Sequence, residues 1–293
     1  MVPPLPLEIE LYILDHALPP LTPKRLGDRR VFLKTLSLVR RAWRPYAQKK
    51  LFAFPKVDNR VDRLHRWTLG VGMRRIDAVE VEYRVGDGRA LLQTMETVRQ
   101  ASAQSRTMEL LLRAPDYPST LRELWPNLAK FTLEAIGSTS ITYGFIFSSL
   151  SPALTYLSLH RVSLLSAPSC TLNHLTTLLL SHVLPDAPDD FLAAFPSLQS
   201  LAWANNYPAS IVPILMSALP SKLRHLFLAH ALDGLTQELE KLETPLASLS
   251  VVAMSPATAE ALEPWCAAHS VELRLLKEKK AGEADIQEWA LAL

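Results

Sequence analysis

Hydrophobic residues follow two different periods along this 293-residue chain. Over residues 5–52 they recur every three or four positions, which is the spacing of one face of an α-helix. From residue 76 onward the dominant pattern is a short block in which apolar and other residues alternate, as they do in a β-strand. The pattern therefore predicts an N-terminal helical region followed by a longer α/β region.

The N-terminal region predicts three short helices. Pro6 is tolerated in the first turn of a helix, where its missing N–H has no partner to lose. Leu18 precedes Pro19 and therefore avoids the helical conformation, which ends the first helix. A second apolar stripe follows at Phe32, Leu36, Val39 and Trp43. So few residues bury little apolar surface by themselves, and we expect their apolar faces to be covered by the remaining chain or by another protein.

A block of the form LxxLxL repeats through the second region. Its clearest copy is LTYLSL at residues 154–159, and successive copies are 21 to 31 residues apart. The central apolar residues of the copies are Val79, Leu110, Phe131, Leu157, Leu178, Leu201, Leu226, Leu249 and Leu273. This block and this period are typical of leucine-rich repeats, in which each turn of a solenoid has one parallel strand and a helical or irregular return. The alternative is an ordinary α/β sheet with leucine-rich strands.

The segments between blocks predict helices where they are long enough, over 189–195, 209–219, 235–242 and 257–267. The ninth position of each copy departs from the leucine-rich consensus, which has Asn or Cys there. Only Asn206 matches, and the other copies have Ile136, Val162, Val183, Ala231 and Met254. We therefore expect turns that are less regular than in a consensus repeat protein.

Composition narrows the class of protein. With 48% hydrophobic and 20% charged residues, the chain can bury a sizeable core. Cys170 and Cys266 are too isolated to indicate a disulfide framework or a zinc site. No apolar run reaches the roughly 18 residues of a membrane helix, and the N-terminus lacks the features of a signal peptide. We expect a soluble, reduced protein of the cytoplasm or nucleus, with no membrane partner, metal or cofactor.

Charge is unevenly distributed. The formal net charge is +2, but residues 1–75 are basic and the remainder is acidic. A basic segment can indicate nucleic-acid binding. Here the charges are spread over helices and spacers without a recognisable nucleic-acid module, which favours a solvated basic surface and no nucleic-acid partner.

Catalytic motifs are not found in the sequence. Residues 70–72 and 86–88 lack the glycines and the basic residue of a phosphate-binding loop. Gly137-Ser138 lacks the second glycine of a nucleophile elbow. The histidines are dispersed, with His160, His182 and His230 just after predicted strands, and we expect loop or surface histidines. The sequence therefore predicts a protein that is not an enzyme and has no catalytic residues.

The two halves of the N-terminal pattern resemble a known family. LPLEIELYILDHAL at 5–18 and LSLVRRAWRPYAQKKLF at 36–52 are similar to the F-box, the helical motif that docks on the Skp adaptor of a cullin-type ubiquitin ligase. The spacer 19–34 is longer and more charged than a compact F-box needs, as in fungal members of the family. The resemblance implies that the adaptor is bound by Leu5, Pro6, Ile9, Ile13, Leu14, Leu36, Val39, Trp43 and Leu51.

Taken with the repeats, the whole chain resembles F-box proteins with degenerate leucine-rich repeats. The expected domains are an F-box-like helical domain at 1–55, a connector at 56–75 and a leucine-rich-repeat-like solenoid at 76–293. The resemblance implies a substrate-recognition subunit that binds the Skp adaptor, and through it a cullin, and presents an unknown protein substrate. The alternative is an interaction scaffold without a role in ubiquitination, whose N-terminal helices cap the solenoid.

The repeats also predict a target-binding surface. Residues between the inward leucines of each block point out of the sheet on its concave side. Most of them are small and polar, but Tyr156, Leu179, His225 and Phe227 are not. Large side chains facing water on adjacent strands are typical of a protein-binding surface. The alternatives are that the C-terminal tail or a loop covers them, or that the register is shifted by one residue, which would exchange the two faces.

Overall fold

The structure is a computed structural model of residues 1–293. It describes residues 5–19, 25–53, 56–58, 78–82, 96, 99–100, 108–114, 128–135, 141–142, 147, 150–164, 168, 170–185, 187–204, 212–229, 235–242, 246–253, 256–277, 286 and 289–290. Most of the expected connector 56–75 lies outside these residues, as do the two Gly-rich segments, Gly137-Ser138, Ile136, Asn206, His230, Ala231 and Met254.

The N-terminal region is helical, as its apolar spacing predicts. It contains α1 (Leu7–Ala17), α2 (Leu26–Val39), the single 3₁₀ turn η1 (Arg41–Trp43) and α3 (Arg44–Ala53). Pro6 stands immediately before the first helical residue, and Leu18 leaves α1 in an extended conformation ahead of Pro19. These elements share a small core of their own, formed by Leu14, Leu18, Leu33, Leu36 and Ala47.

The rest of the described chain is built on an open parallel sheet of ten strands. The strands are β1 (Lys56–Asp58), β2 (Ala78–Glu82), β3 (Met108–Ala114), β4 (Leu128–Ala135), β6 (Tyr156–His160), β8 (Thr177–Ser181), β10 (Ser200–Ala204), β11 (His225–Leu228), β12 (Ser248–Ala253) and β13 (Glu272–Lys277). They lie side by side in chain order. A second parallel sheet contains β5 (Ile141–Thr142), β7 (Val162–Leu164) and β9 (Leu184–Pro185). The predicted class, α/β with an N-terminal helical region, is confirmed.

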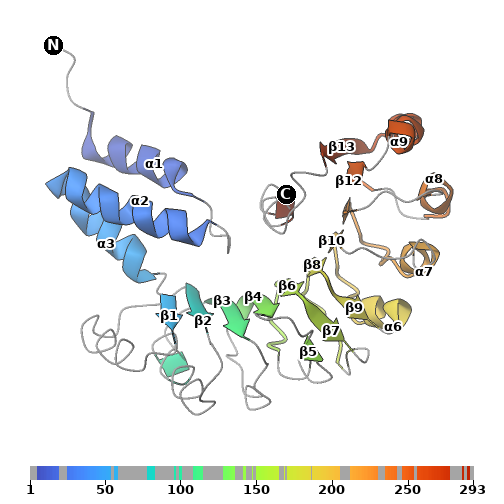
Figure 1. The fold of residues 1–293 in the computed structure, drawn as a ribbon, viewed down its shortest axis with the longest axis horizontal. Helices are drawn as coiled ribbons and strands as arrows, with labels where there is room; N and C mark the ends of the chain where they lie inside the picture. Colours follow the sequence, from blue (N-terminus) through green and yellow to red (C-terminus); the bar gives the residue numbers. More distant parts are fainter. Residues whose placement is uncertain are drawn as a thin grey trace.

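Helices return the chain from one strand to the next in the C-terminal half. They are α6 (Pro188–Ala193), α7 (Val212–Ser217), α8 (Leu235–Leu239) and α9 (Pro256–His269), each within or close to a range predicted from the sequence. The strands follow an arc with these four helices on its outer side (Figure 1). The described residues 286 and 289–290 lie on its inner side. We call the two sides of the sheet the helical face and the inner face.

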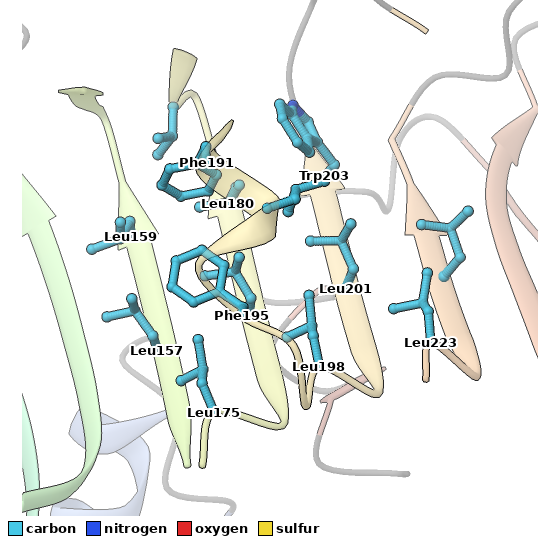
Figure 2. Packing of buried hydrophobic residues seen from close by; sticks show 14 of the residues in the cluster. Leu157, Leu159, Leu175, Leu180, Phe191, Phe195, Leu198, Leu201, Trp203 and Leu223 are labelled. Carbon is cyan, nitrogen blue, oxygen red and sulfur yellow. The ribbon is translucent and has the colours of Figure 1, made fainter. Parts of the chain in front are cut away.

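The main core lies between the sheet and these helices. Neighbouring strands place the central residues of the repeats side by side, so that Leu157 pairs with Leu178 and Leu178 with Leu201. These leucines are fully buried. Figure 2 shows Phe195 between Leu157 and Leu201, and Phe191 beside Leu180. The two phenylalanine rings meet edge to face with centroids 5.1 Å apart, a favourable arrangement for aromatic pairs. The predicted inward register of the repeats is therefore correct.

The turns after the strands are stabilised in an unusual way for this repeat pattern. Val162 and Val183 occupy the position where the consensus has a hydrogen-bonding Asn, and both are fully buried in the main core. The residues just before them, Arg161 and His182, have positive φ angles of 58° and 52°, which non-glycine residues seldom adopt. Their N–H groups donate to the carbonyl oxygens of Ser181 and Ala204 on the next strand. Apolar burial and these hydrogen bonds hold the turns that the sequence predicted to be irregular.

Candidate protein-binding surfaces

The helical region exposes an apolar surface. Eight of the ten large apolar side chains that are exposed among the described residues lie on α1, on α2 or just before α1. We call them the helical apolar surface: Leu5, Leu7, Ile9, Tyr12, Ile13, Val31, Leu38 and Val39. Their exposed fractions run from 38% for Leu7 to 86% for Leu38. Apolar residues gathered in this way on one small region usually mark an interaction site.

Helical geometry explains why these residues face outward. Leu14 and Leu18 lie one turn apart and point into the small core against Leu33 of α2. Ile9 and Ile13, which are also one turn apart, then lie on another side of α1, with 47% and 51% of their surfaces exposed. The helix is apolar on more of its circumference than the other helices can cover.

Polar contacts fix the orientation of α1. The Glu10 carboxylate accepts a hydrogen bond from Trp43 Nε1 at 2.9 Å and pairs with Arg40. The hydrogen bond from Arg40, and then that from Trp43, lowers the pKa of Glu10 from its usual 4.5. Asp15 lies one and a half turns further along α1 and contacts α3. The pKa of Asp15 is lowered from its usual 3.8, mainly by the hydrogen bond from Lys50 and to a smaller extent by that from Tyr46.

The contacts of Asp15 are short. Tyr46 donates its hydroxyl hydrogen to Asp15 Oδ1 at 2.6 Å, and Lys50 Nζ lies 2.7 Å from the same oxygen. With the Glu10 contacts, they attach both ends of α1 to η1 and α3. Because these ties lie on the side of α1 that faces the other helices, they hold Ile9 and Ile13 toward solvent.

The residues expected to bind the adaptor divide into two groups in the structure. Leu5, Pro6, Ile9, Ile13 and Val39 are exposed and belong to the helical apolar surface or lie beside it. Leu14 and Leu36 are buried in the small core, and Trp43 and Leu51 are half-buried against it, so these four maintain the helices. Sequence reasoning missed Leu7, Tyr12, Val31 and Leu38. The sequence did not separate these four residues from core residues, because adjacent residues of a helix can both contact one core, as Phe32 and Leu33 of α2 do.

The inner face of the sheet carries a second apolar cluster. Leu179, Ala202 and Phe227 stand side by side on β8, β10 and β11 and are fully buried, although they point away from the main core. Ile286 and Trp289, near the C-terminus, belong to the same cluster and cover it. The ring centroids of Phe227 and Trp289 are 5.6 Å apart at an angle of 58°.

This arrangement corrects one expectation for the target-binding residues. Tyr156, Leu179, His225 and Phe227 do lie on the inner face, as the repeat register predicts. Their predicted exposure is wrong, since Leu179 and Phe227 are fully buried and Tyr156 and His225 are partly buried. A covering C-terminal tail was one of the alternatives left open, and no local pattern favoured it over the others. Their role in target binding stays a prediction.

Polar residues occupy the inner face of β6, beside the apolar cluster. Ser158 and His160 are buried, and Ser158 Oγ lies 2.7 Å from His160 Nε2 in a hydrogen bond. Burial raises the pKa of Tyr156 on the same strand, and a hydrogen bond with Ser158 partly offsets this rise. A serine next to a histidine is the beginning of a nucleophile–base pair. At 0% and 1% exposure, however, neither side chain is open to a substrate.

Two predictions for histidines differ in outcome. His160 is buried, so the expectation of a loop or surface position is wrong for it. His182 is exposed in a turn, as expected. His225 accepts or donates a 2.9 Å hydrogen bond with Ser248 Oγ, and its pKa is lowered by burial and by the charge of Arg274.

The described residues contain no group of three or more His, Cys, Asp or Glu side chains that could hold a metal ion. No helix in the described part of the chain is long and apolar enough to cross a membrane.

Cys170 and Cys266 are free thiols, and burial raises the pKa of both. A raised pKa leaves less of the reactive thiolate, which is typical of cysteines that serve packing.

Comparisons with known proteins do not assign the chain to a family. No protein-family model matches the sequence, and no match was found among curated proteins. The resemblance to F-box proteins therefore stays a prediction from residues 5–52 and from the repeats. The function proposed below depends on these residues and on where the structure places them.

Proposed function

We propose that this protein is the substrate-recognition subunit of a Skp-cullin-F-box ubiquitin ligase. In this proposal the N-terminal helices form an F-box-like domain that binds the Skp adaptor. The repeats form a leucine-rich-repeat-like solenoid that binds the protein to be ubiquitinated. The observation that carries the proposal is the helical apolar surface, which sits on the segment whose sequence resembles the F-box.

The helical apolar surface has the character of a protein-binding site. Hot spots at interfaces are large side chains held in place by packed neighbours. Ile9, Tyr12 and Ile13 meet this description, because they are exposed on a helix whose other side is fixed by a small core and by the Glu10 and Asp15 contacts. Such a surface is more stable when a partner removes it from water.

A second candidate is an interaction scaffold in which the helices only cap the first strands. Capping requires the apolar residues of α1 to pack against the sheet. Among the described residues, those of α1, α2, η1 and α3 form their own core, and none belongs to either apolar cluster of the sheet. Leu5, Ile9 and Ile13 are exposed. These positions favour adaptor binding over capping.

The solenoid part of the proposal is supported by the sheet. Each LxxLxL block that is described forms one parallel strand, and each strand pairs with the strand of the following block. The returns in the C-terminal half are helices on one face of the sheet. In a ligase, a receptor of this kind accelerates transfer by holding its target near the conjugating enzyme, so no residue of this chain performs the chemistry.

The proposal is tested by measuring the affinity of the purified chain for a recombinant Skp adaptor by calorimetry. Ile9→Asp and Ile13→Asp each place a charge in the proposed interface, and we expect each to weaken binding at least tenfold, or about 1.4 kcal/mol. Ile214→Asp on α7 is the matched control, since Ile214 is 42% exposed and lies outside the helical region. It should bind normally.

All three positions are exposed, so the variants should keep the melting temperature of the parent chain. Equal affinities for the parent and the two α1 variants would refute adaptor binding through this surface. A parent chain that does not bind the adaptor at all would refute the proposed function as a whole.

A further inference from the structure

The inner face of the sheet has a continuous apolar floor. Leu179, Ala202 and Phe227 form one row across three neighbouring strands. Ala204, Ala229 and Val252 are buried in the same cluster. Ala202 lies between the larger side chains of Leu179 and Phe227 in this row. It is separate from the main core, which lies on the helical face.

Residues near the C-terminus occupy this floor. Ile286, Trp289 and Ala290 are helical, and we call them the C-terminal cover. Ile286 and Trp289 are three positions apart, so a helix presents them on one side, and both are buried. The last strand, β13, ends at Lys277 at the edge of the sheet, whereas the cover contacts the cluster of β8, β10, β11 and β12. These three residues therefore lie inside the arc of strands in Figure 1.

The cover fits the floor imperfectly. Trp289 Nε1 is buried without a hydrogen-bond partner, and so is the hydroxyl of Ser250. Ser250 stands next to Phe227 in the strand register, and the ring of Phe227 packs against that of Trp289. Two buried polar groups beside one aromatic contact both remain unsatisfied, which is destabilising. The apolar fit is good, but the polar fit is incomplete.

We propose that the inner face is a binding groove for a helical peptide of a protein partner, and that the C-terminal cover occupies this groove until the partner displaces it. The occupant shows the chemistry that fits: an aliphatic side chain followed three positions later by an aromatic one. A partner that also carries a carboxylate or carboxamide able to accept from the Ser250 hydroxyl would satisfy a group that the cover leaves unsatisfied. The inference deepens the proposed function, on which it rests, by assigning the kind of target segment.

The C-terminal cover and a partner peptide compete for the same groove, and this competition sets the apparent affinity of the chain for the peptide. A segment tethered to its own groove acts at an effective concentration of the order of millimolar. The apparent affinity of a partner peptide is reduced by the fraction of molecules in which the groove is open. Weakening the cover should therefore strengthen peptide binding without any new contact.

The test uses a fluorescent peptide with the sequence of residues 279–293 and measures its binding by anisotropy. One receptor is the full chain, and the other is the full chain with Ile286→Ser and Trp289→Ser. We expect saturable binding to the double variant and at least tenfold weaker binding to the parent chain. A control peptide with Trp289→Ala should lose binding to the double variant. A receptor with Ile214→Ser, on the outer side, should behave as the parent.

Equal affinity for the two receptors would overturn the proposal, and so would absence of binding to a folded double variant. If the double variant does not fold, native-state hydrogen exchange on the unchanged full chain decides. The amides of Ile286, Trp289 and Ala290 should then exchange at least a hundredfold faster than those of β10 and β11. Equal protection would show that the cover is a fixed part of the fold and overturn the proposal.

Adaptor binding is measured on the same proteins. The helical apolar surface and the cover contain different residues, so the double variant should bind the Skp adaptor as the parent does. Loss of adaptor binding in every protein would refute the proposed function and leave the peptide result intact. Normal adaptor binding with no peptide binding would refute the groove alone.

Discussion

The helical region and the sheet differ in how much of their apolar surface is buried. The helical region buries a small core of Leu14, Leu18, Leu33, Leu36 and Ala47 and leaves eight large apolar side chains exposed. The sheet buries apolar residues on both faces, under helices on one side and under the C-terminal cover on the other. The sheet therefore covers its apolar surface with other parts of the same chain, whereas the helical region leaves much of its apolar surface open to solvent. This exposure is why the adaptor proposal places binding on the helical region.

The two regions also differ in what holds them together. The small helical core is supplemented by contacts of Glu10 and Asp15 with cationic and aromatic side chains. The sheet depends on stacked leucines and on the rings of Phe147, Phe191 and Phe195. The centroids of these three rings are 5.1 to 6.0 Å apart from one another. Carboxylate contacts respond to pH, whereas apolar burial does not. The predictions below use this contrast.

The largest effect is expected for Leu226→Asp on β11. Leu226 is fully buried in the main core, so the substitution places a carboxylate among leucines with no partner. We expect loss of more than about 4 kcal/mol in the free energy of unfolding. Thermal denaturation measures it. Ile13→Asp makes the same kind of change at an exposed position and should melt with the parent. A Leu226→Asp protein that melts with the parent would show that the described register is wrong.

The second prediction asks whether the two regions unfold independently, and it uses one substitution in each region. Leu33→Ala empties part of the helical core and Leu180→Ala part of the main core, and both side chains are buried. Each should lower the stability of its region by about 2 to 5 kcal/mol. Because the cores share no residue, hydrogen exchange should show Leu33→Ala loosening only the helices. Equal loosening of β8 and β10 would mean that the regions unfold as one unit.

A smaller effect is expected in acid. The folded helical region holds the pKa values of Glu10 and Asp15 below their usual 4.5 and 3.8. The stabilisation is therefore present above about pH 4.5 and is lost as the pH falls through the lowered values, because protonation removes the contacts. Helix content followed by circular dichroism should decrease over this range. Glu10→Gln with Asp15→Asn should weaken this dependence, and an unchanged acid profile would contradict the role of these contacts.

The smallest effect concerns His225. Burial and the charge of Arg274 lower its pKa from the usual 6.5, so the folded state favours the neutral ring. The corresponding stability of the sheet is present above pH 6.5 and lost as the pH falls through the lowered value. We expect a small decrease in melting temperature between pH 7 and pH 5. Arg274→Ala should reduce this dependence. A melting temperature that falls equally in His225→Gln would assign the dependence to other groups.

Local patterns in the sequence were enough to predict the class of fold. The helical spacing around Ile9 and Ile13 predicted α1, and the prolines at its two ends predicted its limits. The LxxLxL block predicted both the strands and their inward residues, since Leu157 and Leu159 are buried on the helical face. These features depend on residues close together in the chain, so they can be recognised without knowing the rest of the structure.

Exposure was the feature that local patterns could not determine. Leu14 and Ile13 are both apolar and adjacent, yet the first is in the small core and the second is exposed, because α2 and α3 lie on only one side of α1. Leu179 and Phe227 have the alternation of exposed strand residues, yet they are buried.

The sequence by itself determined the periods, the elements and the inward side of each strand, because steric preferences and side-chain alternation act between neighbouring residues. Only the tertiary structure decided which apolar faces are covered. Trp289 lies more than 60 residues from Phe227 in the chain, and no local period indicates that the two rings pack together at 5.6 Å. Burial depends on such distant contacts, whose geometry is fixed only when the whole chain is folded.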